Sequence, residues 1–166
     1  MLTIILVILG ITSRLVVHTP QFTALLAVTF FGGMYLKGKQ ALWMPLVVMA
    51  VSDLFLGFHD TMFFTWGSIA LISCLGFYLR NRKSWMSVLG GSVAASVIFF
   101  VITNFGAWLS PLYPHTLAGL QSCYINAIPF YRTTLTSTVV FSMLLYVSYE
   151  YLLARRDNPV LAKLLA

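Results

Sequence analysis

The 166-residue chain is too apolar for a water-soluble globule, because 60% of its residues are hydrophobic and only 8% are charged. Soluble domains carry about a quarter charged residues. The composition therefore excludes a cytosolic enzyme, a secreted disulfide scaffold and a disordered tail, and it indicates an integral membrane protein. The formal net charge is +6, but the basic residues interrupt apolar runs instead of forming one basic face, so nucleic acid is not an expected partner.

The length limits how many times the chain can cross a bilayer. One crossing takes about 20 residues, so 166 residues allow five or six crossings and leave no room for a separate soluble domain. We therefore expect residues 1–166 to form a single transmembrane domain. The two cysteines, Cys74 and Cys123, lie in apolar surroundings and do not indicate a disulfide framework.

Charged residues and prolines divide the chain into six predicted helices. The first is short and carries Arg14 near its far end, and the third carries Asp53 in its last turn. The six predicted helices cover 1–17, 22–36, 41–57, 62–79, 85–109 and 133–154. Several of them are short for a bilayer, which indicates tilt or local thinning of the membrane.

The segment between the last two predicted helices contains three prolines, Pro111, Pro114 and Pro129. Proline disrupts helix interiors. Irregular backbone at membrane depth survives only where it is buried in protein or lines a cavity. We therefore expect Ser110–Tyr131 to form an ordered re-entrant or interfacial segment between helices five and six.

Six crossings place the loops on alternate sides of the membrane, and the basic residues divide unevenly between these sides. Basic residues in short loops mark the cytoplasmic side. This distribution predicts a multi-pass membrane protein with both termini cytoplasmic. The outer side receives only Arg14 and Arg132, whereas the cytoplasmic side receives Lys37, Lys39, Arg80, Arg82, Lys83, Arg155, Arg156 and Lys163.

The uncommon polar side chains collect on the outer side. Ionisable groups near membrane depth usually face a cavity and pair with one another, and an arginine in a cavity would clamp a carboxylate or phosphate. The alternative is that Arg14–Asp53 and Arg132–Asp60 are ion pairs that only hold helix ends together. We predict an outward-facing substrate pocket built from Arg14, His18, Asp53, His59, Asp60, Asn104, Trp108, Tyr113, His115, Tyr124, Asn126 and Arg132.

Two aromatic and turn-rich runs, 104–108 and 113–132, have two interpretations. Tryptophan and tyrosine often form belts at the membrane interface, but rigid aromatic residues with a few polar groups also suit a lid or wall over a pocket. The glycine pairs Gly32-Gly33 and Gly90-Gly91 indicate close helix packing rather than catalysis.

A second hypothesis uses the histidines of the outer side. Histidine and carboxylate suit several transition metals, so His59, Asp60 and His115 would serve a small membrane-embedded metal-binding protein or enzyme, although their spacing matches no ligand motif. The sequence has no acyl-nucleophile, zinc-protease or phosphate-loop motif. We therefore expect a protein that is not an enzyme, and no cofactor is assigned. A third possibility is a structural membrane partner without a ligand.

Four runs of the sequence resemble an uncharacterised bacterial membrane family of transport proteins, related to the S components of energy-coupling-factor vitamin transporters. The resemblance covers nearly the whole chain. It is carried by residues 14–23 (RLVVHTPQFT), 51–60 (VSDLFLGFHD), 103–108 (TNFGAW) and 113–130, which begins with Tyr113-Pro114 and ends with Pro129-Phe130.

The resemblance implies an S-component-like bundle of about six helices, with both termini inside and a pocket that opens outward under loop lids. It implies uptake of a vitamin-like or small organic nutrient, bound near Asp53, His18, Asn104 and Trp108. It also implies a transmembrane coupling subunit with ATPases as partners. The first helix lacks the Ala-x-x-x-Ala docking motif, so a solitary protein is the alternative. Through cobalamin-binding relatives, Cys74 and His18 become candidate cobalt ligands.

Overall fold

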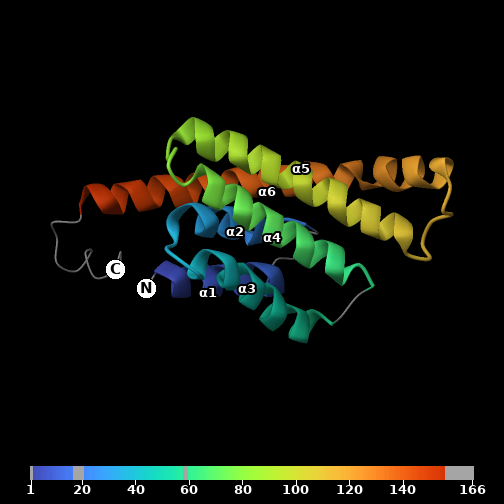
Figure 1. Ribbon diagram of the computed structural model, residues 1–166, viewed down its shortest axis with the longest axis horizontal. Helices are drawn as coiled ribbons and strands as arrows, with labels where there is room; N and C mark the ends of the chain where they lie inside the picture. The colour runs from blue at the N-terminus through green and yellow to red at the C-terminus, as the bar shows by residue number, and fades with distance from the viewer. Residues whose placement is uncertain (1, 17–20, 58–59, 156–166) are drawn as a thin grey trace.

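The fold is an all-α bundle, as predicted (Figure 1). The structure is a computed structural model that describes residues 2–16, 21–57 and 60–155, and these ranges contain no strand. The helices are α1 (Leu2–Val16), α2 (Leu25–Tyr35), α3 (Gln40–Leu56), α4 (Met62–Leu79), α5 (Trp85–Leu109) and α6 (Leu117–Ala154). Helices α4 and α5 have the predicted bounds, and the bounds of α1, α2 and α3 differ from the predicted ones by a few residues at most.

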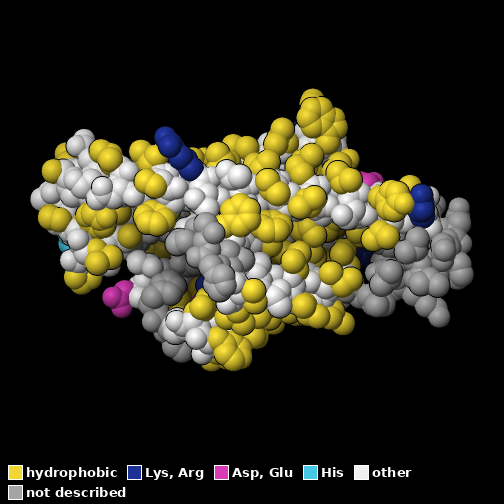
Figure 2. All heavy atoms as spheres, turned by 180° about the vertical axis from the view of Figure 1, so that it is seen from behind, with side chains coloured by type: hydrophobic (Ala, Val, Ile, Leu, Met, Phe, Trp, Pro, Cys, Tyr) yellow, Lys and Arg dark blue, Asp and Glu magenta, His cyan; other side chains and the backbone are white. Residues whose placement is uncertain are grey.

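The outer surface of the bundle is largely apolar, which supports a membrane protein. Within the described ranges, α4, α5 and α6 are long and apolar enough to cross a bilayer, whereas α1, α2 and α3 are apolar but shorter. Large hydrophobic side chains such as Phe63, Tyr78 and Leu117 are about four-fifths exposed (81%, 78% and 80%), and hydrophobic side chains cover much of the face in Figure 2. Contiguous apolar surface of this kind indicates contact with lipid.

Helix α2 forms the centre of the bundle. Every residue from Leu25 to Tyr35 is buried, and α2 packs against all five other helices. A helix that is apolar around its whole circumference is expected to be enclosed in this way. At its end, the ring of Tyr35 lies 4.8 Å from that of Tyr149 on α6, and its hydroxyl donates to Glu150 at 3.0 Å.

Helices α2 and α4 cross at two glycines. A side chain at Gly33 would collide with the Ser73 carbonyl and would lie 3.1 Å from the Cα of Gly76. The predicted role of glycine in packing is therefore confirmed at Gly33, and it is confirmed at Gly91, whose missing side chain leaves room for the Phe30 ring. It is wrong at Gly90, which faces open space because successive helix residues point about 100° apart.

The predicted break over Ser110–Tyr131 is largely wrong. Only residues 110–116 are irregular, and α6 begins at Leu117 and continues through Pro129. Proline removes one backbone donor, so Pro129 leaves the carbonyl of Ile125, four residues earlier, without its helix bond. The helix continues despite this loss, and the hydroxyls of Thr133 and Thr134 donate to other carbonyls, those of Pro129 and Phe130, at 3.4 Å and 3.0 Å. The segment is thus mostly the first half of a long helix.

Successive helices run in opposite directions, so alternate loops meet at the same end of the bundle. Thr3 at the start of α1 bonds to Gln40 at the start of α3, and the ammonium of Lys83 lies over the ring of Tyr35. This end also holds the last turn of α6, as Figure 1 shows. It is called the basic end here, because it carries six of the eight described basic residues: Lys37, Lys39, Arg80, Arg82, Lys83 and Arg155.

Candidate functional site

The opposite end of the bundle contains a buried ion pair between α1 and α3. Arg14 Nη1 lies 2.8 Å from Asp53 Oδ1, and the two side chains are 13% and 1% exposed. Arg14 comes from the last turn of α1, and Asp53 from the last turn of α3. Because an isolated buried charge is very costly, each group stabilises the other, and the predicted Arg14–Asp53 pair is confirmed.

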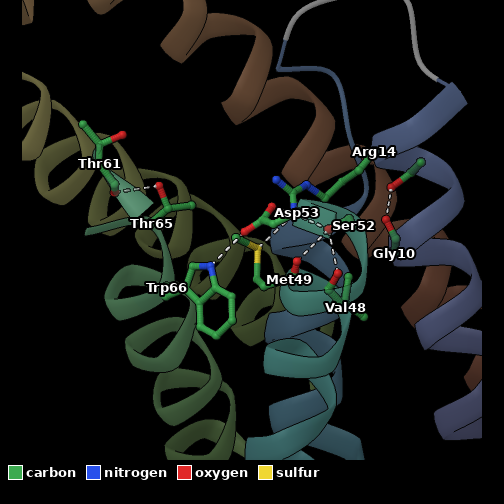
Figure 3. A network of polar contacts seen from close by, with 10 residues as sticks. Gly10, Arg14, Val48, Met49, Ser52, Asp53, Thr61, Thr65 and Trp66 are labelled. Carbon is green, nitrogen blue, oxygen red and sulfur yellow. Dashed lines mark hydrogen bonds and ion pairs between the residues drawn. The ribbon is translucent and has the colours of Figure 1, made fainter. Parts of the chain in front are cut away.

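Further donors complete this polar network (Figure 3). The indole of Trp66 donates to Asp53 Oδ2 at 2.9 Å, so α4 joins the pair. Arg14 also donates to the hydroxyl of Ser52, and that hydroxyl donates to the carbonyl of Val48 at 2.6 Å. Asp53 Oδ2 therefore accepts a hydrogen bond, whereas Oδ1 has the ion pair with Arg14 but no hydrogen-bond partner among the described residues. The network joins the ends of three helices.

A cavity of about 390 Å³ lies next to Arg14, within the range of ligand pockets. All six helices contribute to its wall, together with the segments that join α1 to α2 and α3 to α4. It therefore exists only in the folded bundle, and it lies away from the basic end. The lining residues are Arg14, Gln21, Thr23, Leu25, Leu26, Leu56, Thr61, Thr65, Phe99, Thr103, Thr134 and Ser137.

The hydroxyl groups of the cavity wall are oriented by their own helices. Thr103, Thr134 and Ser137 each donate to a backbone carbonyl three or four residues earlier, at 2.8 to 3.0 Å. Because a hydroxyl has one donor and two acceptor positions, these oxygens keep acceptor capacity. Arg14 has only donors. The wall therefore combines one cationic donor with several neutral acceptors.

A smaller hollow of about 80 Å³ adjoins the cavity. The two share Gln21, Phe99, Thr103 and Thr134. Gln21 has a left-handed backbone (φ 64°), which is uncommon for a residue other than glycine. The smaller hollow extends the site toward Asn104 and the aromatic side chains of Phe100, Phe130 and Tyr131.

The predicted site residues fall into several groups. Arg14 and Asp53 are paired at the cavity, where Arg14 lines the wall. Asn104 lines the smaller hollow, and its amide donates to the carbonyl of Phe100 at 2.7 Å. His18 and His59 lie outside the described residues. The second suggested pair, Arg132–Asp60, does not form in the described structure, where both residues are exposed.

The other predicted residues belong to the hairpin formed by α5 and α6. Trp108 donates to the carbonyl of Pro114 at 3.1 Å, and its ring lies 5.7 Å from that of His115. Tyr124 donates to the carbonyl of Val101 at 2.7 Å. These contacts hold the hairpin closed. None of Trp108, Tyr113, His115, Tyr124 and Asn126 lines either hollow.

The sequence prediction missed the uncharged polar wall. Thr65, Thr103, Thr134 and Ser137 were not among the predicted residues, and neither were Gln21 and Trp66. One signal was present for α6, because Thr134, Ser137 and Thr138 recur at helical spacing in an apolar helix and are all buried. This spacing places them on one face, which predicts a polar interior surface.

The metal hypothesis finds no support in the described residues. Across those ranges, no three histidine, cysteine or acidic side chains come close enough to hold an ion. Cys74 is exposed on α4 and Cys123 is buried, and both are free thiols. Cys123 Sγ donates to the carbonyl of Asn104 at 3.3 Å, which is consistent with a structural role in the α5–α6 hairpin.

Comparison with known proteins places the chain in a family. The model of a family of unknown function, DUF6580, matches residues 1–161, so the chain belongs to this family. No curated protein and no solved structure matches the chain. The expected membership of an uncharacterised family is thus confirmed, while the relation to S components of energy-coupling-factor transporters stays a prediction.

Proposed function

We propose that this member of the DUF6580 family is a membrane-embedded, substrate-binding transport protein that takes up a small organic nutrient through the cavity beside Arg14. The observation that carries the proposal is a cavity of about 390 Å³ whose wall is shared by all six helices. A site shared by all helices couples ligand binding to the arrangement of the whole bundle, which is what alternating access requires.

The chemistry of the wall defines the class of ligand. Arg14 favours a carboxylate, phosphate or carbonyl group, while the hydroxyl oxygens of Thr103, Thr134 and Ser137 favour N–H or O–H donors. Leu25, Leu26 and Phe99 supply apolar contact. A vitamin-like molecule, with an acidic group at one end and several hydrogen-bond donors, matches this combination.

Buried hydroxyls continue from the cavity along α6. Thr134 and Ser137 line the cavity, and Thr138 and Ser142 follow at the spacing of one helix turn, fully buried. The hydroxyl of Ser142 has no hydrogen-bond partner among the described residues. A line of polar groups through an apolar bundle supports passage of a polar solute toward the basic end.

The proposed arrangement in the membrane has six crossings, with the basic end in the cytoplasm and the cavity facing outward. The three shorter helices would cross by tilt or by local thinning of the bilayer. The grouping of six basic residues at one end supports this orientation. An S-component-like protein of this kind would obtain energy from a coupling subunit with ATPases, or would act alone by facilitated diffusion.

Filling the cavity is expected to abolish ligand binding. Thr103→Leu adds bulk and removes an acceptor at a residue that lines both hollows. We expect native mass spectrometry of gently extracted wild-type protein to show a co-purified small molecule, and the Thr103→Leu protein to retain less than a tenth of it. The matched control is Val93→Leu, on the same helix at a 40% exposed position that lines neither hollow.

The comparison of these variants shows whether the small molecule binds in the cavity or elsewhere on the protein. A small molecule that is retained equally in Thr103→Leu and Val93→Leu would place its site elsewhere. A wild-type protein that carries no small molecule, and binds none from an extract of bacterial metabolites, would contradict the proposed function.

The proposed orientation predicts which loops react with an impermeant reagent. In a background with Cys74→Ala and Cys123→Ala, we expect a membrane-impermeant maleimide to label Leu112→Cys in intact spheroplasts and to label Asn81→Cys only after lysis. Leu112 lies in the α5–α6 connection, and Asn81 lies at the basic end. Both positions are exposed. The reverse order of labelling would contradict the orientation.

A further inference from the structure

A groove on the outer surface of the bundle is built almost entirely from apolar side chains. It lies between α4 and α5 and has a volume of about 600 Å³. Cys74 lines it, and Tyr78 is the α4 lining residue nearest the basic end. The remaining lining residues are Leu71 and Leu75 of α4 and Val97, Ile98, Val101 and Ile102 of α5. An apolar groove of this kind can accommodate a hydrocarbon chain.

A second, more polar hollow continues from the same groove. It has a volume of about 580 Å³ and is lined by Phe77, Tyr78, Arg80 and Asn81. Tyr78 belongs to both hollows. The guanidinium carbon of Arg80 lies 4.9 Å from the centre of the Phe77 ring, so this side chain lies against the helix end beside the hollow. Two further basic residues, Arg82 and Lys83, follow directly in the chain.

The depth of the groove matches that of a lipid in the membrane. From Leu71 to Tyr78, α4 rises about 10 Å, at about 1.5 Å per residue. Tyrosine prefers the level of the lipid headgroups, and arginine can reach the phosphates from that level. The polar hollow would therefore lie among the headgroups, and the groove would extend from it along the upper part of an acyl chain.

We propose that the α4–α5 groove binds one anionic phospholipid, with an acyl chain along the groove and the phosphate at Arg80 and Asn81. Charge selects the occupant, because residues 80–83 include three basic residues and no acidic one. A basic pocket beside a membrane helix recognises an anionic headgroup. The headgroup of a zwitterionic lipid carries a positive charge, which these basic residues would repel. The proposal rests on the membrane contact of the bundle and not on the ligand of the cavity.

The experiment compares two lipids that differ only in the headgroup. We would titrate detergent-solubilised full-length protein with phosphatidylglycerol or phosphatidylcholine of identical acyl chains, and measure the first bound lipid by native mass spectrometry. The expected result is at least fivefold tighter binding of phosphatidylglycerol, since a basic residue near a headgroup contributes about a fivefold change in affinity. Glycerol phosphate without an acyl chain should not compete.

Two pairs of variants locate the site. Arg80→Ala with Asn81→Ala should weaken phosphatidylglycerol binding about fivefold to tenfold, whereas Arg155→Ala, an exposed basic residue on α6 at the same end, should not change it. Val97→Trp fills the groove and should weaken binding of both lipids. Its control, Val93→Trp, lies one turn earlier on α5 at a 40% exposed position outside the groove.

Several results would overturn the proposal. These are equal affinity for the two lipids, or an unchanged affinity in the Arg80→Ala/Asn81→Ala protein. Effective competition by glycerol phosphate alone would show an anion site without a role for the groove. A dimer that Val97→Trp dissociates would show that a second copy of the chain, and not a lipid, covers this surface.

Discussion

Asp53→Ala is expected to lower the free energy of unfolding by about 3–5 kcal/mol, because it leaves the buried guanidinium of Arg14 without its counter-charge. The carboxylate also accepts a hydrogen bond from the indole N–H of Trp66 at 2.9 Å, and this N–H would lose its acceptor as well. The loss should appear as a lower midpoint of thermal unfolding in detergent. Asp60→Ala provides the control, since Asp60 is an exposed acidic residue in the described structure and its removal should change the midpoint little.

A double variant tests whether the lost stability comes from the charge left behind. Replacing a buried ion pair by apolar residues of similar volume is often neutral or stabilising. Arg14→Met with Asp53→Leu should therefore unfold at a higher temperature than Asp53→Ala alone. If the double variant were as unstable as the sum of Arg14→Met and Asp53→Leu measured singly, the two side chains would have no interaction energy, and the unpaired charge would not explain the loss.

The same reasoning determines which variants can report on ligand binding. Arg14 both lines the cavity and neutralises Asp53, so a change at either residue alters the fold and the site together. A loss of binding in these variants would not identify the ligand's contacts. Thr103 is a better position, because within the described residues its hydroxyl bonds to the carbonyl of Phe99 in its own helix and to no other helix.

Charge was the reliable guide to the fold. The basic cluster of residues 80–83 ends an apolar run, and this set the end of α4 and the start of α5, whereas the prolines from Pro111 onward set the end of α5. Charge also indicated the Arg14–Asp53 pair, since isolated charges in apolar helices require partners. Farther along the chain, proline was the misleading signal. Pro129 was expected to end a helix, but it lies inside a continuous α6, where its missing N–H removes one backbone hydrogen bond.

The cavity wall could be predicted only in part, because its residues come from all six helices. A threonine in an apolar helix bonds to its own backbone whether it faces lipid, core or cavity, so Thr65 and Thr103 carry no distinctive sequence signal. Whether Thr65 and Thr103 face the same cavity depends on how the helices cross. Trp108 and Tyr124 of the α5–α6 hairpin are conspicuous in the sequence, but they bond within the hairpin and line neither hollow. Phe130 and Tyr131, from the same aromatic run, do line the smaller hollow.

Gly76→Ala is expected to destabilise the bundle by about 3 kcal/mol, at the upper end of the usual cost of overpacking. The added methyl would collide with the Phe30 carbonyl and would lie 3.0 Å from the Met34 nitrogen and 3.1 Å from the Gly33 Cα. All three are backbone atoms of α2, so no change of rotamer can relieve the collision. Helices α2 and α4 would have to move apart, which would also displace Trp66 from Asp53.

The same helix contains a matched control. Gly67 also lies in α4, but a methyl group there meets nothing within 4 Å. Gly67→Ala should therefore be neutral or slightly stabilising, because alanine favours the helix by up to about 1 kcal/mol over glycine. Equal unfolding midpoints for Gly76→Ala and Gly67→Ala would show that the two helices do not meet at their backbones. A lowered midpoint for Gly76→Ala alone would show that the backbones of α2 and α4 are in close contact at Gly76, so that the packing of the central helix depends on this glycine.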